Sequence, residues 1–214
     1  MKILSSFFFC LFLLCPMETY AAAPVAIIET TLAPTKHLRS FEVQVAQEFY
    51  SAVREKSILS HGVLKFERPH SFRLEMGKPQ EGLYVSDGKI LWQYTPQTHH
   101  AQKMDAARLP LPFLDVLTRQ AALADHYRID DFKETSERLF FQLTPLTVSS
   151  TQPQSTHFFV EVKRSTGFFH QVELRRETGD WTKWSFEGWN KRAQFKPGTF
   201  AFVPPPGTVV DTGP

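Results

Sequence analysis

The chain has 214 residues, of which 42% are hydrophobic and 21% charged, and its formal net charge is +2. This length and composition predict one domain with a sizeable core and exclude global disorder. So small a net charge argues against nucleic acid as the main partner, because nucleic-acid binding calls for a concentrated basic face.

Residues 1–23 have the layout of a secretory signal peptide. Lys2 supplies a positive charge, residues 3–15 form an apolar run broken by two serines, and Ala21 and Ala23 are small residues suited to cleavage. The apolar run is too short for a membrane-spanning helix, which needs about 20 residues. We therefore expect the mature protein to be exported, soluble and built as one domain over residues 24–214.

Both cysteines, Cys10 and Cys15, lie in the expected signal peptide. Without them the mature chain would have no disulfide, no thiolate nucleophile and no thiolate metal site. Leu14 precedes Cys15, whereas the lipid-modified cysteine of a bacterial lipoprotein follows a small residue. We therefore expect no lipid anchor at Cys15.

The first predicted element of the mature chain is a helix within residues 24–40, which Pro34 breaks or kinks. Alternating apolar and polar residues then predict a half-buried strand over residues 41–49. The same alternation recurs over residues 63–66, 72–76 and 83–94. Within the last of these segments, Asp87 and Gly88 predict a tight hairpin turn.

The middle of the chain predicts a short amphipathic helix over residues 110–119, with prolines in its first turn, and a further helical turn over residues 121–126. Strand patterns return over residues 127–132, 139–143, 158–162, 168–174 and 181–186. A final strand is expected at Phe200 and Phe202. About ten strands with two helices predict a strongly curved antiparallel sheet that encloses something.

The common catalytic and cofactor-binding motifs are absent from the sequence, including the nucleophile elbow, the phosphate-binding loop and the dinucleotide fingerprint. His99 and His100 are adjacent and would point to opposite faces of a strand, so we expect solvated side chains and no metal site. Two interpretations are open for the tryptophans near the C-terminus, which are Trp181, Trp184 and Trp189. They could stack on a ligand, or they could pack in the ordinary way within the protein. The sequence indicates neither a metal nor a cofactor.

Four segments in a fixed order resemble the outer-membrane lipoprotein carrier family, LolA. They are residues 62–74 with Arg68-Pro69, residues 84–94 with Ser-Asp-Gly-Lys before Leu-Trp, residues 111–117, and residues 200–211 with Phe-x-Phe-x-Pro-Pro-x-Gly. Each segment is a weak signal alone, but the ordered set is fairly specific. The resemblance runs from about residue 41 to residue 211.

The resemblance implies a mainly β fold with an N-terminal helix, an incomplete antiparallel β-barrel and a short helical lid over an apolar cavity. It implies a periplasmic chaperone, not an enzyme, which carries lipoproteins from an inner-membrane lipoprotein-releasing ABC transporter to an outer-membrane lipoprotein receptor. We expect this carrier to be a monomer. Each buried methylene contributes about 0.8 kcal/mol, so acyl chains need an apolar container to cross an aqueous compartment.

The resemblance also implies roles for individual residues. Arg68 is implied to latch the lid in its closed state, for which the five fixed donors of a guanidinium are well suited. The implied cavity lining is Phe72, Leu74, Met76 and Trp92, and the implied lid plug is Phe113, Leu114 and Leu117. The side of the 83–94 hairpin that faces the cavity stays open at this point.

Other functions are compatible with the same fold. The chain could carry another lipid, or it could be a module that senses lipid or mislocalised lipoprotein. A membrane-anchored acceptor of this fold would need an acylated cysteine, which the mature chain would lack. A secreted hydrolase would need a nucleophile and a base, and no spacing in the sequence suggests them.

Overall fold

The structure is a computed structural model that describes residues 22–106, 112–118, 123–146 and 157–212. The expected signal peptide, residues 1–23, therefore lies outside the described residues except for its last two positions. Those two positions begin helix α1 (Ala22–Lys36), which contains Pro34. In the described ranges, no helix combines the length and the hydropathy that crossing a membrane requires.

The other elements follow α1 in an order close to the one expected. They are β1 (Ser40–Ser51), β2 (Lys56–Glu67), β3 (Ser71–Met76), β4 (Gly82–Asp87), β5 (Ile90–Thr95), the 3-10 helix η1 (Pro96–Thr98), β6 (His100–Asp105), α2 (Pro112–Thr118), the 3-10 helix η3 (Leu123–Asp125), β7 (Tyr127–Glu134), β8 (Arg138–Pro145), β9 (His157–Lys163), β10 (Phe168–Arg175), β11 (Trp181–Asn190) and β12 (Val209–Thr212).

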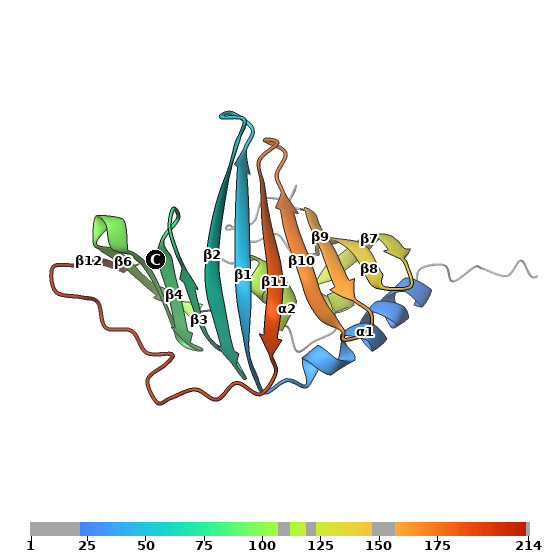
Figure 1. The fold of residues 1–214 in the computed structure, drawn as a ribbon, viewed down its shortest axis with the longest axis horizontal. Helices are drawn as coiled ribbons and strands as arrows, with labels where there is room; N and C mark the ends of the chain where they lie inside the picture. The colour runs from blue at the N-terminus through green and yellow to red at the C-terminus, as the bar shows by residue number, and fades with distance from the viewer. Residues whose placement is uncertain (1–21, 107–111, 119–122, 147–156, 213–214) are drawn as a thin grey trace, which may run out of the picture.

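Within the described ranges, twelve strands form one sheet in the order β12-β6-β5-β4-β3-β2-β1-β11-β10-β9-β8-β7 (Figure 1). Neighbouring strands are antiparallel, apart from β12, which runs parallel to β6. The two edge strands, β12 and β7, do not pair with each other, so the sheet is an open half-barrel. This confirms the mainly β, half-open fold expected from the sequence.

One face of this sheet, which we call the inner face, is apolar and carries both α-helices. Across the β1–β2–β3 ladder, Phe41 is paired with Phe66 and Phe66 with Phe72. Residues paired in this way point to the same side of a sheet. These side chains share one buried cluster with Ile28 of α1 and Leu114 of α2. Figure 1 shows α2 behind β1 and β11, on the side away from the viewer.

The C-terminal segment differs from the expected strand at Phe200 and Phe202. Neither residue lies in a strand, and the last strand is β12 instead. Phe202 packs against the rings of Trp92 and Tyr94, with ring centroids 5.6 and 5.4 Å apart. Contacts between side chains therefore place this segment, and the prolines that follow it have no N–H for strand pairing. Strand β6 was also not expected, because most of its residues are polar and show no clear alternation.

The turn between β4 and β5 has the geometry that its sequence predicts. Gly88 has a φ of 93°, a left-handed conformation that glycine adopts without strain. The carboxylate of Asp87 accepts hydrogen bonds from the backbone N–H groups of Lys89 and Ile90, both at 2.8 Å. These two bonds hold the pKa of Asp87 below its ordinary value, and the bond from Ile90 has the largest effect.

Replacing Asp87 tests how much this turn stabilises the sheet. Asp87→Ala removes an acceptor of two hydrogen bonds, so we expect the free energy of unfolding to fall by about 1 kcal/mol. Because folding lowers the pKa of Asp87, its contribution is complete above the pKa of an unfolded aspartate and is lost as the pH falls through the folded pKa. Urea unfolding at neutral and acidic pH checks both points. A difference between the two proteins that grew on acidification would contradict them.

Candidate functional site

The inner face brings together the three β3 side chains that were expected to line a cavity. Phe72, Leu74 and Met76 are buried, with 4%, 1% and 6% of their surface exposed, and all three belong to the cluster that includes the helices. Their common direction follows from the period of two along a strand. Their position is therefore as expected, while their role as the lining of a lipid cavity stays a prediction.

The two α-helices pack closely on the inner face where they meet β10. Between α1, α2 and β10 the remaining gap is about 10 Å³, lined by Leu32, Thr35, Lys36, Val116, Leu117, Leu123 and Phe169. A gap of this size holds at most about one water molecule. A larger apolar ligand can reach this part of the inner face only if the helices move away from it.

The expected plug residues lie on α2. Leu114 and Leu117 are buried in the same cluster as the β3 side chains. The side chain of Phe113 lies outside the described residues. For Leu114 and Leu117 the placement agrees with the expectation, and the action of a plug stays a prediction.

Arg68, the expected latch, holds the end of α1. Its Nε donates to the carbonyl oxygen of Leu38 at 2.7 Å, and its Nη2 donates to the carbonyl oxygen of Lys36 at 2.6 Å. Lys36 is the last residue of α1, where carbonyls lack partners within the helix. Burial lowers the pKa of Arg68. Among the described residues, the guanidinium of Arg68 therefore bonds to the end of α1 and to the segment after it. The sequence analysis had expected it to bond to the lid helix, α2.

α1 has two further attachments that the sequence did not suggest. A carboxylate oxygen of Glu29 accepts a hydrogen bond from the backbone N–H of Leu123 at 2.9 Å, and Glu29 is also paired with Lys36. At the β9–β10 turn, a Cβ added to Gly167 would lie 2.1 Å from the carbonyl oxygen of Thr31. A glycine is therefore required where α1 crosses the turn. The sequence offered one signal for the first attachment, namely that Glu29 is the single acidic residue within the predicted helix.

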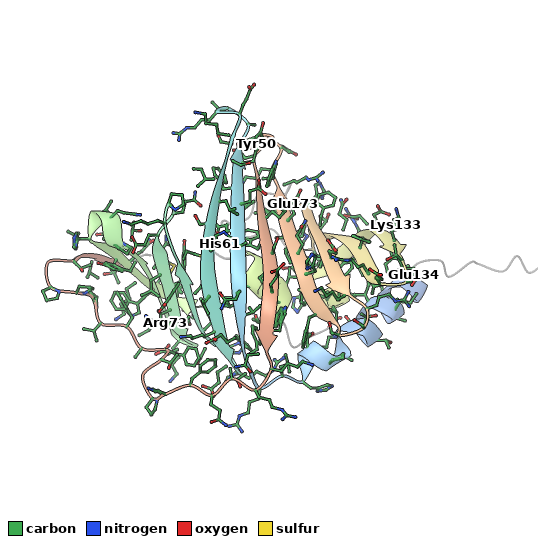
Figure 2. The ribbon with its side chains drawn as sticks, viewed as in Figure 1. Tyr50, His61, Arg73, Lys133, Glu134 and Glu173 are labelled. Atoms are coloured by element: carbon green, nitrogen blue, oxygen red, sulfur yellow. The ribbon has the colours of Figure 1, made fainter. Side chains whose placement is uncertain are left out.

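Trp92 does not lie where the sequence analysis placed it. The register joins Arg73 to Val85 and Val85 to Trp92, so these three residues share one face. Arg73 alternates with Phe72 and Leu74 and therefore lies on the other side of the sheet, which we call the outer face (Figure 2). Trp92 packs there against Phe202. The expectation that Trp92 lines the cavity is thus wrong.

The other candidate residues have structural partners. His100 Nε2 lies 2.7 Å from a carboxylate oxygen of Asp211, across the β6–β12 pair. Trp181 stacks on Tyr50 with ring centroids 5.5 Å apart, and Trp189 packs against Phe168 at 4.9 Å. These contacts favour packing over ligand stacking for the two tryptophans. Over the ranges that the structure describes, no group of three His, Cys, Asp or Glu side chains is arranged to hold a metal ion.

Comparison with known proteins points to one family. The family model "Outer membrane lipoprotein carrier protein LolA" matches residues 36–203. The outer-membrane lipoprotein carrier protein of Photobacterium profundum is 28% identical over 203 residues, which cover 90% of this chain and 96% of the relative. The protein of the same name from Proteus mirabilis is 28% identical over 176 residues, or 81% of this chain and 82% of the relative.

A solved structure supports the fold. The crystal structure of an uncharacterized conserved protein from Thermus thermophilus has a TM-score of 0.52 and 12% sequence identity, covering 89% of this chain and 98% of that chain. At this identity the likeness concerns the fold alone.

Proposed function

Because the chain belongs to the family of the outer membrane lipoprotein carrier protein LolA, we propose that it is a lipoprotein carrier that holds acyl chains against its inner face. The observation that carries this proposal is the apolar inner face, which in the described ranges is covered by the helices α1 and α2. Its side chains come from both halves of the sheet, from Phe72 on β3 to Phe141 on β8. The surface is therefore wide enough to take elongated hydrocarbon chains.

The energetics of the helices suit a carrier that must also release its cargo. The helices bury five large apolar side chains on the cluster: Ile28, Leu32, Leu114, Val116 and Leu117. At about 2 kcal/mol each, these side chains contribute about 10 kcal/mol. One acyl chain of about 16 carbons contributes about 12 kcal/mol at about 0.8 kcal/mol per methylene. The contacts that the helices regain on release therefore offset about the contribution of one acyl chain, which helps the carrier to release cargo to an acceptor.

We further propose that the protein works in the periplasm. Export would remove residues 1–23 and leave residues 24–214 as a single carrier domain. Cargo would come from an inner-membrane lipoprotein-releasing ABC transporter and pass to an outer-membrane lipoprotein receptor. The names of the curated relatives, outer-membrane lipoprotein carrier proteins, support this route. The family is one of carriers, so the proposal includes no catalytic step.

Capture of an acylated lipoprotein tests the proposed function directly. The mature protein is incubated with membrane vesicles that hold a diacylated lipoprotein, and the soluble fraction is separated by gel filtration. We expect the lipoprotein to elute with the protein. The control is the same lipoprotein with its acylated cysteine replaced by serine, which lacks acyl chains and is expected not to bind.

Equal binding of the acylated and non-acylated forms would contradict the proposal. Capture without later transfer to outer-membrane vesicles would instead favour the lipid-sensing module of the same fold. Purifying the protein from its own periplasm and identifying bound lipoproteins by mass spectrometry defines the natural cargo.

A further inference from the structure

One row of the inner face ends in polar side chains on β1 and β2, in the half of these strands toward the hairpin, the end at which Tyr50 is labelled in Figure 2. One cross-strand row on this face runs, from β8 to β2, through Phe141, Val160, Val172, Trp184, Gln47 and Ser60. The row is apolar as far as the ring of Trp184 and ends in an amide and a hydroxyl. A hydrocarbon chain lying along this row would therefore have polar groups at one end.

The polar groups at this end bond to one another. Gln47 Nε2 donates to Gln80 Oε1 at 3.0 Å, and the indole N–H of Trp184 donates to Gln47 Oε1 at 3.0 Å. The backbone N–H of Gln80 donates to the hydroxyl of Ser60 at 3.3 Å. We call Gln47, Ser60, Gln80 and Trp184 the amide cluster. Its members come from β1, β2, β11 and the loop between β3 and β4, which are joined here through side chains.

Two members of the amide cluster, Ser60 and Trp184, are buried, and Gln47 and Gln80 are half-buried. Ser60 is 0% exposed, and Thr182, two residues before Trp184 on the same strand face, is 6% exposed. Burying polar groups costs free energy unless they are paired, so an apolar side chain at position 47 would extend the core at lower cost. Buried Ser86 differs, because its hydroxyl accepts from the N–H of Gly88 at 3.0 Å and so belongs to a turn.

We propose that the amide cluster binds the ester and amide carbonyls that join the acyl chains of the cargo to its polar head. This inference rests on the proposed carrier function. Such carbonyls accept hydrogen bonds and lie at the end of a hydrocarbon chain, which matches donors at the end of an apolar row. In the closed state, the N–H donors of Gln47 and Trp184 are paired with acceptor oxygens within the cluster.

Movement of the loop that carries Gln80 lets a carbonyl oxygen of the cargo take its place. Gln47 Nε2 then donates to that oxygen in place of Gln80 Oε1. The amide of Gln47 exchanges one acceptor for another and is not left unpaired, which avoids the cost of a buried unsatisfied donor. The cluster therefore stabilises the closed state without cargo and positions the linkage region when cargo is bound.

The test compares two probes that differ in their carbonyls. One is a synthetic diacylated lipopeptide with ester-linked chains, and the other is its ether-linked analogue with chains of equal length. We expect the wild-type protein to bind the ester probe about fivefold more tightly than the ether probe. Gln47→Leu is expected to lose this preference and to keep its affinity for the ether probe.

Two further variants complete the test. Gln44→Leu changes an exposed glutamine on the outer side of the same strand and is expected to keep the fivefold preference. Gln80→Ala removes the acceptor that competes with the cargo carbonyl for Gln47 Nε2, so it is expected to increase the preference. This result tests the subsite even if Gln47→Leu does not fold, as judged by circular dichroism. Equal affinity of the wild type for both probes would refute the subsite and leave the carrier function standing. Binding of neither probe would refute both.

Discussion

Phe72→Glu is expected to abolish capture of acylated lipoprotein. Phe72 is 4% exposed and lies on the inner face in register with Phe66 of β2. A carboxylate there is surrounded by apolar side chains, and its desolvation costs several kcal/mol unless it takes up a proton. Loss of the buried ring adds about 3 to 5 kcal/mol to the destabilisation of the fold. Vesicle release assays, with circular dichroism and thermal melting beside them, measure both effects.

Arg73→Glu is the matched control for Phe72→Glu. Arg73 is the next residue on the same strand, but it points to the outer face, where it is paired with Glu75 and donates to the carbonyl oxygen of Thr199 at 3.5 Å. A carboxylate at this position stays in contact with water, so we expect a loss of at most about 1 kcal/mol of stability and near-normal capture. A folded Phe72→Glu protein that captured lipoprotein at the wild-type rate would show that the inner face does not hold acyl chains.

Arg68→Leu is expected to leave the sheet intact and to impair delivery of cargo. The substitution removes two charge-assisted hydrogen bonds from the carbonyls of Lys36 and Leu38 at the end of α1. Each such bond contributes about 1.5 to 3 kcal/mol when buried, and partial exposure of Arg68 reduces this, so we expect the closed state to lose about 2 kcal/mol. In the proposed carrier cycle, return of α1 to the inner face helps to expel the cargo. We therefore expect weaker closure to leave the acyl chains bound for longer.

Hydrogen exchange and transfer assays check the Arg68 prediction. The backbone amides of α1 are expected to exchange faster in Arg68→Leu, while those of β1 and β2 keep the wild-type rate. Arg68→Lys keeps the charge but not the fork of donors that reaches two carbonyls, so its transfer rate is expected to lie between those of the wild type and Arg68→Leu. Unchanged exchange in α1 together with wild-type transfer would count against the latch.

Most of the strand pattern could be predicted from the sequence because most strands have their own local signal. Phe72, Leu74 and Met76 alternate with charged residues, and a period of two puts them on one face in any sheet. Asp87 and Gly88 define a turn through interactions with their immediate neighbours. The weakly patterned β6 has no such signal.

The partners of Arg68, Trp92 and Gln47 depend on segments that are distant in the chain. Arg68 contacts carbonyls that lie about 30 residues earlier, and Gln47 accepts from the indole of Trp184 on the neighbouring strand β11, 137 residues later in the chain. The direction of Trp92 follows from its register through β4 to β3 and from the ring of Phe202, which packs against it.

The sequence by itself determined the mainly β fold, the direction of the β3 side chains and the family, because these follow from local alternation and from motifs in a fixed order. The tertiary structure alone decided that Arg68 holds α1, that Trp92 faces outward and that one row of the inner face ends in an amide cluster. The physical reason is that alternation gives each strand two opposite faces, but only pairing with distant strands and packing of the helices decide which face is covered.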